Sequence, residues 1–364
     1  MKIGIFTFYC AANYGAVLQT YCLQEVLKDM GHDVFVIDYR PKYLVESYKT
    51  FAYSSDIYNS FLEKCKGFVR ACLVAPIRWK RHRNFSKFIH ARLNLYHLDL
   101  NDESNDFDAF VFGSDQIWNP KITCGFDKVY LGDFPAAKGK KLIAYAASAG
   151  SVSNFAGEDV NYFLSRLRCF DKVLVREKSL ADYLNQSALF TSEVVLDPVL
   201  LAGRNVLERL LSKQKTISHS SYLLLFQIGR NDEIVEYATK VANEKKLQMI
   251  DVVTVRESLN NKLIKQTLSV ECLLEYFKDA SYIITSSFHG TVLSILFSKQ
   301  FNTVSVNANT DERALFLLEN LQIPEHLVFV DKPYLAKKID YGSVNVNYEE
   351  LKKKSLDILN ELCL

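Results

Sequence analysis

The chain has 364 residues, which is more than one compact core usually holds, so we expect two domains. Apolar residues make up 49% and charged residues 24% of the chain, an ordinary globular composition that excludes extended disorder. The formal net charge of +2 does not indicate a nucleic-acid-binding surface. An anionic ligand must therefore be held by locally placed cationic side chains.

Residues 2–8 indicate a buried strand and not a signal peptide, because the apolar run is short and a polar loop follows. Other apolar runs, such as 222–226, fall far short of the roughly 18 residues that a membrane-spanning helix needs. We expect a cytoplasmic protein, with the inner face of the membrane as a further place of action. The eight cysteines form no Cys-x-x-Cys pair, which predicts reduced core cysteines.

The first part of the chain, residues 1–200, has the pattern of a βα domain. A strand, a helix and a strand in this order form a right-handed βαβ unit. Residues 42–105 differ, because their apolar residues recur at helical spacing, and we expect a helical insertion there. Its basic run 78–83 indicates either a solvated helix face or a contact with an anionic acceptor or a membrane surface. Strands are expected at 2–8, 33–39, 107–112, 141–146, 172–175 and 194–196, and helices at 16–30, 158–168 and 178–187.

A second βα series is expected over residues 201–345. A last helix in 346–364 is expected to pack back on the first domain. The predicted fold class is α/β, with two Rossmann-like doubly wound domains facing a cleft, and ligands in such sheets bind beyond the carboxyl ends of the strands. Strands are expected at 222–228, 247–253, 282–285 and 301–306, and helices at 232–245, 270–279, 290–299 and 312–321.

The turn at residues 286–290 joins an apolar strand to a helix. Free amides and the helix dipole at that end favour an anion. His289 can bind a phosphate as imidazolium or transfer a proton. The alternative is a serine N-cap beside a structural histidine. The remaining candidate ligands of the turn are the hydroxyls of Ser286, Ser287 and Thr291 and the backbone at Gly290.

Two arginines are candidates to hold a carboxylate or phosphate with two hydrogen bonds. Arg313 is expected to open the helix after the strand 301–306, on the same sheet edge as the turn. Arg176 ends the strand 172–175 and can point into the cleft. The alternatives are ion pairs with Asp311 or Glu312 for the first arginine, and with Glu177 for the second.

Two loops of the first domain are expected to face the same cleft, at 13–15 and 113–119. Their amides, hydroxyls and aromatic face suit a sugar, so we predict an acceptor-binding surface. Asp115 is a candidate base for an acceptor hydroxyl, and its alternative is a turn-forming aspartate. The predicted acceptor-binding residues are Asn13, Tyr14, Ser114, Gln116 and Trp118.

Several cofactor motifs are missing from the sequence. A Gly-x-Gly-x-x-Gly after the first strand and a P-loop do not occur, which removes support for NAD and ATP. The Asp-x-Asp at 106–108 is a weak match to metal-dependent glycosyltransferases and lies at the start of a strand. We therefore expect neither a metal nor a cofactor.

Taken together, the motifs resemble the polysaccharide pyruvyl transferase family. They are Asn13-Tyr14-Gly15-Ala16-Val17-Leu18-Gln19, Gly113-Ser114-Asp115-Gln116-Ile117-Trp118-Asn119-Pro120, Tyr145-Ala146-Ala147-Ser148, Val175-Arg176-Glu177, Asp197-Pro198 and Ser287-Phe288-His289-Gly290-Thr291. Many members carry an aspartate where this chain has Ser286. The tail from about 325 and the insertion lie outside the resemblance.

This resemblance implies a GT-B-like fold and a reaction. Phosphoenolpyruvate would give its enolpyruvyl group to two hydroxyls of a sugar in a surface polysaccharide, or in its lipid-linked precursor, leaving a pyruvate ketal and phosphate. The resemblance assigns Arg176, His289 and Arg313 to phosphoenolpyruvate. Two alternatives stay open, a glycosyltransferase that uses a nucleotide sugar and a non-catalytic carbohydrate- or anion-binding protein.

Overall fold

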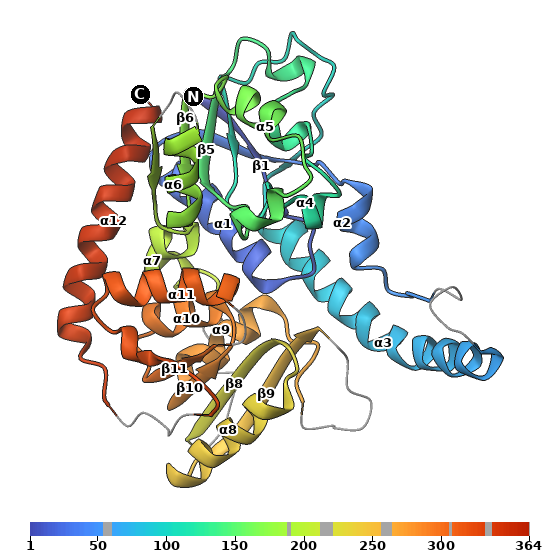
Figure 1. The fold of residues 1–364 in the computed structure, drawn as a ribbon, viewed down its shortest axis with the longest axis vertical. Helices are drawn as coiled ribbons and strands as arrows, with labels where there is room; N and C mark the ends of the chain where they lie inside the picture. The colour runs from blue at the N-terminus through green and yellow to red at the C-terminus, as the bar shows by residue number, and fades with distance from the viewer. Residues whose placement is uncertain are drawn as a thin grey trace.

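The structure is a computed structural model, and it describes residues 1–53, 60–187, 191–211, 221–255, 264–305, 308–331 and 337–363. The described strands form two parallel sheets, one in each half of the chain, with helices packed on both (Figure 1). The predicted α/β class with two doubly wound sheets is confirmed. Within the described ranges, every helix is too short or too polar to span a bilayer.

The first sheet has the order β3-β2-β1-β4-β5-β6-β7. The direction of winding reverses between β1 and β4, and the crevice at such a switch point is where doubly wound sheets bind ligands. Four neighbouring strands, β4 to β7, end at the same edge and send their following loops into one region. The strands are β1 (Lys2–Phe6), β2 (Asp33–Ile37), β3 (Leu95–Tyr96), β4 (Ala109–Phe112), β5 (Lys141–Ala147), β6 (Lys172–Val175) and β7 (Ser192–Val194).

Helix α1 (Tyr14–Asp29) follows the first strand and lies almost wholly buried. Asn13 caps its start, since the Asn13 side chain accepts hydrogen bonds from the amides of Gly15 and Ala16. The helix ends before Gly31, whose φ of 88° suits glycine. The other helices of this half include α5 (Val160–Leu167) and α6 (Lys178–Ser187), close to their predicted positions.

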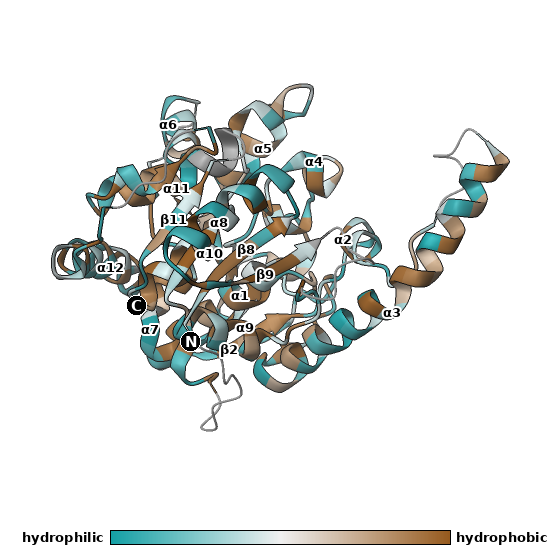
Figure 2. Cartoon of the chain, turned by 90° about the horizontal axis from the view of Figure 1, so that it is seen from below, coloured by the Kyte–Doolittle hydropathy of each residue, from teal (hydrophilic) through white to brown (hydrophobic). Residues whose placement is uncertain are grey.

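The expected helical insertion at 42–105 is correct for its first part only. Helix α2 (Lys42–Ser47) and the long α3 (Phe61–Arg92) occupy it, and α3 projects away from the body of the molecule (Figures 1 and 2). The chain then returns as β3, which pairs with β2 at the sheet edge. Two residues are too few to show strand periodicity, so the sequence did not reveal this strand.

The second sheet has the order β12-β11-β10-β8-β9 and reverses between β8 and β10. Its strands are β8 (Tyr222–Gly229), β9 (Gln248–Val255), β10 (Tyr282–Thr285), β11 (Phe301–Val304) and β12 (Leu327–Val328). The helices are α8 (Asp232–Glu244), α9 (Val270–Asp279), α10 (Phe288–Leu296) and α11 (Ala308–Asn320). Both α10 and α11 start earlier than expected, and the last residue of the predicted strand 301–306 lies outside the described residues.

Two helices connect the halves. Helix α7 (Pro198–Glu208) was not predicted, and it packs on α1. Helix α12 (Tyr341–Cys363) runs along both halves (Figure 1). Its Ser355 accepts a hydrogen bond from the amide of Leu196 at 3.1 Å, and its Tyr348 donates one to the carbonyl of Leu200 at 2.6 Å.

The cysteine prediction is correct in part. The seven cysteines with described side chains are free, but four of them are exposed and so are not core residues: Cys65, Cys72, Cys124 and Cys169. Exposure of Cys65 and Cys72 follows from the projection of α3. The side chain of Cys363 lies outside the described residues.

Candidate active site

The predicted anion-binding turn follows β10, and the structure changes the roles of several of its residues. Ser287 caps α10, because its hydroxyl accepts the amide of Gly290 at 3.4 Å. A Cβ at Gly290 would lie 2.1 Å from the hydroxyl of Thr285, so this glycine permits packing on β10 and not ligand approach. Thr291 is fully buried and its hydroxyl bonds that of Thr303. Its predicted contact with phosphoenolpyruvate is therefore corrected, and within the turn Ser286 and His289 stay half-buried.

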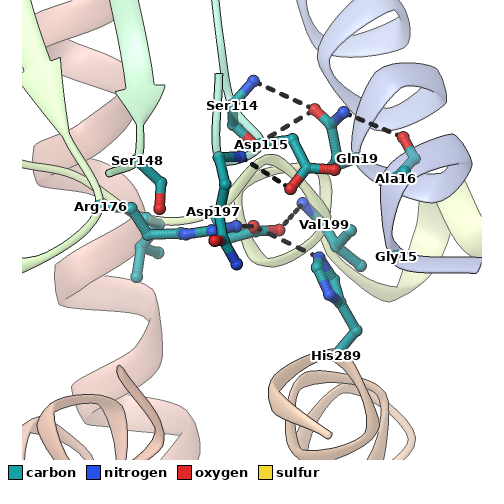
Figure 3. A network of polar contacts seen from close by, with 12 residues as sticks. Gly15, Ala16, Gln19, Ser114, Asp115, Ser148, Arg176, Asp197, Val199 and His289 are labelled. Carbon is teal, nitrogen blue, oxygen red and sulfur yellow. Dashed lines mark hydrogen bonds and ion pairs between the residues drawn. The ribbon is translucent and has the colours of Figure 1, made fainter. Parts of the chain in front are cut away.

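A buried carboxylate from the other half of the chain reaches His289. Oδ2 of Asp197 lies 3.5 Å from Nε2 of His289 and 2.9 Å from Nη1 of Arg176 (Figure 3). Oδ1 of the same carboxylate accepts the amide of Val199 at 2.9 Å. Asp197 is thus the N-cap of α7, with Pro198 at the first helical position. One side chain caps a helix and joins the two candidate cations.

Charge and burial compete at Asp197. Burial acts to raise its pKa, but His289 and Arg176 beside it and the Val199 amide hold the pKa well below its ordinary value. The carboxylate is therefore ionised at neutral pH. It places a negative charge 3.5 Å from Nε2 of His289. The turn itself carries Ser286, and the carboxylate next to the histidine comes from Asp197 in the first half of the chain.

The other face of the His289 ring lies against the start of α1. A Cβ at Gly15 would come within 2.3 Å of Nδ1 of His289. Only glycine leaves room for the ring there. The first βα loop and the turn after β10 therefore lie in contact. His289 comes from the second half of the chain, but its ring packs against Gly15 of the first half.

Two arginines approach the same aromatic ring from the two halves. The guanidinium carbon of Arg176 lies 5.4 Å from the centroid of Phe288, and that of Arg313 lies 5.5 Å from it. Burial lowers the pKa of Arg313, and the positive charge of Arg176 lowers it further. Nη2 of Arg176 and Nε of Arg313 are buried without a hydrogen-bond partner among the described residues. Donors of this kind are what an anion would satisfy.

Arg313 lies within α11 and not at its start, because the helix begins at Ala308. Glu312 accepts the amide of Ser179, and Asp311 has no described side chain. A cavity of about 420 Å³ lies between α6, β7, α11 and α12 and is lined by Arg176, Phe288 and Arg313, but not by His289 or Asp115. Arg176 and His289 share Asp197, but the histidine does not line the cavity that the two arginines line.

Arg176 also has a second acidic neighbour. Its Nε lies 3.6 Å from Oε1 of Glu177, so the ion pair considered from the sequence exists together with the one to Asp197. Oε1 of Glu177 also accepts the hydroxyl of Ser148, while Oε2 has no hydrogen-bond partner among the residues with described side chains. These side chains follow β5, β6 and β7, three neighbouring strands.

The predicted acceptor-binding residues divide into two groups. Three of them are already engaged, and the structure corrects their role. Trp118 is 1% exposed and donates its indole N–H to the carbonyl of Tyr130. Ser114 is fully buried and donates to Gln19. Tyr14 is buried and donates to the carbonyl of Leu268 in the second half at 2.8 Å. Short polar and aromatic residues at these turns serve packing.

The second group stays near the crevice. Asn13 caps α1, and Gln116 is half-buried and accepts a hydrogen bond from Asn119 at 2.7 Å. Asp115 is half-buried and accepts a hydrogen bond from the amide of Gln116. Burial acts to lower the pKa of Arg176, but the neighbouring carboxylates of Glu177, Asp197 and, to a smaller extent, Asp115 raise it. The turn-forming role considered for Asp115 is present, and its role as a base stays a prediction.

Metal binding has no geometric support within the described residues, where no cluster of three or more His, Cys, Asp or Glu side chains forms. Asp106 and Asp108 of the weak Asp-x-Asp match bond the side chain and the amide of Lys2, each at 2.6 Å.

Sequence reasoning missed three residues of this site. Asp197 and Gly15 appeared only within motifs and a loop, and Glu177 only as a possible ion-pair partner of Arg176 and within a motif. An Asp-Pro pair before an apolar run is a helix-start signal, so it could have placed Asp197 at the sheet edge. The contact of Gly15 with His289 joins residues 274 positions apart and has no local signal.

Comparison with known proteins assigns the chain to a family. The sequence profile of the polysaccharide pyruvyl transferases matches residues 13–307. No curated protein matches the chain. Among solved structures, it is similar to a UDP-GlcNAc 2-epimerase from Methanocaldococcus jannaschii, at 11% identity and a TM-score of 0.48, covering 96% of this chain and 92% of that one. It is also similar to S. aureus MnaA with UDP, at 11% identity and a TM-score of 0.47, covering 98% and 90%. Identities this low say nothing about substrate.

Proposed function

The chain belongs to the polysaccharide pyruvyl transferase family and is a pyruvyl transferase, and from this premise we propose that phosphoenolpyruvate is its donor and a sugar with two free hydroxyls its acceptor. One observation carries the choice of donor. Arg176 and Arg313 flank Phe288 with buried donors that lack a partner among the residues that the structure describes, and phosphoenolpyruvate offers a carboxylate and a phosphate to such donors.

The proposed reaction balances without a cofactor. A proton adds to the methylene carbon of phosphoenolpyruvate, which becomes a methyl group, and positive charge develops at the neighbouring carbon. One acceptor hydroxyl adds there and loses its proton. The bond from that carbon to the phosphate oxygen breaks with its electron pair going to phosphate, and the second hydroxyl adds and loses its proton. Of the two protons released, one replaces the proton consumed and one leaves with phosphate.

We assign the proton donor to His289. The Asp197 carboxylate lies 3.5 Å from its Nε2 and can orient the ring, and a positioned general acid typically contributes about 10²–10⁴ in rate. Arg176 and Arg313 hold the donor and stabilise the phosphate as it leaves. Asp115 is the proposed base for an acceptor hydroxyl, since it follows β4 beside the same crevice.

We propose that the acceptor belongs to a surface polysaccharide or its lipid-linked precursor and is modified in the cytoplasm. A cavity of about 220 Å³ beside the first βα loop supports an acceptor site. Its lining includes Ala12, Tyr48, Arg81 and His82. Tyr48 also bonds Asn13, a predicted acceptor-binding residue.

The proposal is tested by ligand-dependent melting and by product analysis. Phosphoenolpyruvate should raise the melting temperature of the purified protein, whereas UDP and GDP should not. Incubation with phosphoenolpyruvate and a panel of sugars should release phosphate and add the mass of a pyruvate ketal to one acceptor. Stabilisation by UDP or GDP alone would instead indicate a nucleotide-sugar glycosyltransferase. Tight binding of phosphoenolpyruvate without phosphate release on any acceptor would indicate a binding protein.

A further inference from the structure

Helix α3 has two unlike parts. Its second part is fixed to the molecule, where Phe85 and Phe88 are buried, Arg81 donates to the carbonyl of Gln266 and Asn84 to that of Thr267. Its first part, residues 61–79, projects from the body as an arm (Figures 1 and 2). We call this part the α3 arm. A capping box of Ser60 and Glu63 fixes its first turn, so the projecting end starts as a defined helix.

The α3 arm exposes large apolar side chains that a soluble helix face normally avoids. At the 3.6 residues per turn of an α-helix their positions fall within an arc of roughly 140°, which places them on one side of the helix. They are Phe61 (83% exposed), Leu62 (64%), Phe68 (49%), Val69 (55%), Leu73 (56%) and Trp79 (56%). Phe51, 45% exposed, packs edge-on against Phe68 and extends the face.

The same helix is strongly cationic. Residues 61–92 contain nine Lys or Arg side chains and one acidic side chain, Glu63. Lys64, Lys66 and Arg70 lie exposed within the arm. A long helix with one apolar face and a basic remainder is typical of segments that lie in the surface of an anionic bilayer. Pairing of this helix with the same helix of a second copy would bring two strongly cationic helices together, and their electrostatic repulsion disfavours such a dimer.

We propose that the α3 arm binds the surface of an anionic phospholipid bilayer, with Phe61, Val69 and Leu73 among the acyl chains and the basic side chains among the headgroups. The proposal extends the proposed function but does not depend on the reaction. Arg78, near the end of the arm, and His82, just beyond it, line the cavity beside the first βα loop. Attachment through α3 would therefore hold the proposed acceptor site close to the membrane, where a lipid-linked acceptor resides.

The test is co-sedimentation of the full chain with vesicles. Vesicles of equal parts phosphatidylcholine and phosphatidylglycerol should sediment the protein at low salt, and vesicles of phosphatidylcholine alone should not. Added salt should weaken binding, because the Debye length falls to about 8 Å at physiological ionic strength. Replacing Lys64, Lys66 and Arg70 together by alanine should weaken binding about a hundredfold.

A matched pair of variants separates the arm from general stickiness. Val69→Glu with Leu73→Glu should weaken vesicle binding at least tenfold, because two apolar side chains leave the acyl region. Val346→Glu, on α12 and 60% exposed, should change nothing. The melting temperature and the response to phosphoenolpyruvate should stay unchanged in all three variants, so a failure of this proposal is distinguishable from a failure of the proposed reaction.

Three results would overturn the proposal. One is equal binding to neutral and anionic vesicles, and another is binding that the Val69→Glu, Leu73→Glu variant retains in full. The third is a wild-type dimer in light scattering that this variant dissociates, without vesicle binding, which would assign the arm to a second copy of the chain.

Discussion

Two groups of residues meet at the crevice, the short side chains of the loops and a cluster of charged side chains. The sequence predicted ligand contacts for both groups, but their contacts in the structure differ. Short polar or aromatic side chains lie in the loops at 13–15 and 113–119 and in the turn at 286–291. Most of them form hydrogen bonds or packing contacts with nearby groups of the protein. Ser287 and Asn13 cap helices, Ser114 bonds Gln19 and Trp118 fills the core. The charged cluster of Arg176, Asp197, His289 and Arg313 instead gathers from four separate elements.

The difference follows from reach. A short side chain at a turn finds the backbone amides next to it and satisfies them, as capping residues do. A guanidinium or imidazole extends past its own backbone and meets groups from distant segments. Among the described residues of these two regions, buried nitrogens without a hydrogen-bond partner belong to the charged cluster, for example Nη2 of Arg176 and Nε of Arg313. Chemistry is therefore expected from the charged cluster and packing from the short side chains.

The largest effect is expected from His289→Ala. Removal of the imidazole should lower kcat by about a thousandfold, within the range for a lost general acid, while the melting temperature changes by no more than a few degrees. Phosphate release from phosphoenolpyruvate measures it. His90→Ala, at an exposed position of α3, is the control and should retain full activity. Near-normal turnover in His289→Ala would contradict a catalytic role for the charged cluster.

Asp197→Asn should lower both activity and stability. The variant removes a carboxylate shared by Arg176 and His289, so kcat should fall about a hundredfold with a changed pH profile. Because a buried ion pair loses one partner, unfolding should become easier by about 3 kcal/mol at neutral pH. Chemical denaturation and initial rates measure the two effects.

The sign of the pH dependence follows from the direction of the shift. The folded pKa of Asp197 lies below its ordinary value, so the carboxylate contributes its full stabilisation above that ordinary value and loses it as the pH falls through the folded pKa. The stability difference between wild type and Asp197→Asn should therefore shrink below about pH 4. Asp106→Asn serves as control, since the Asp106 side chain is 73% exposed and its ion pair with Lys2 should contribute little to stability. A constant difference down to strong acid would contradict the assigned shift.

Gly15→Ala should affect activity without unfolding the protein. The new methyl group would lie 2.3 Å from Nδ1 of His289, so the ring must move, and a displacement of about 1 Å can cost a hundredfold in rate. Alanine favours the helical conformation over glycine by up to about 1 kcal/mol, which offsets the strain in α1. Gly229→Ala, where a Cβ would meet nothing within 4 Å, is the matched control. Full activity in Gly15→Ala would show that the position of the ring does not matter.

The fold was predictable because apolar runs and helical spacing recur along most of the chain. Strands such as β4 and β10 consist wholly of buried residues, and the sequence located them closely. Strands β3 and β12 have two residues each, too few to show a period. Helix α7 was missed because Gly203, with a φ of 75°, interrupts its pattern.

The site was predictable in its charged residues but, apart from Glu177 beside Arg176, not in their partners. Arg176, His289 and Arg313 were found from their places next to strands and from the family motifs. The partnership of Asp197 with His289 crosses from one half of the chain to the other, and no local pattern encodes it. Whether a predicted acceptor-binding residue can reach a sugar also depends on its burial. The sequence of a polar loop does not show whether the ring of its tryptophan faces a ligand or the core.

Tyr14→Phe gives the smallest expected effect and the sharpest separation of the two regions. The phenol donates to the carbonyl of Leu268 across the halves, and its ring packs against Phe85 and Phe226. Loss of the hydroxyl should cost about 1 kcal/mol of stability, measured by denaturant unfolding. The KM for the acceptor should stay within about twofold of wild type, because the hydroxyl is already bonded within the protein and is not offered to a sugar. A large rise in that KM with unchanged stability would return Tyr14 to the acceptor surface and break the distinction between the two regions.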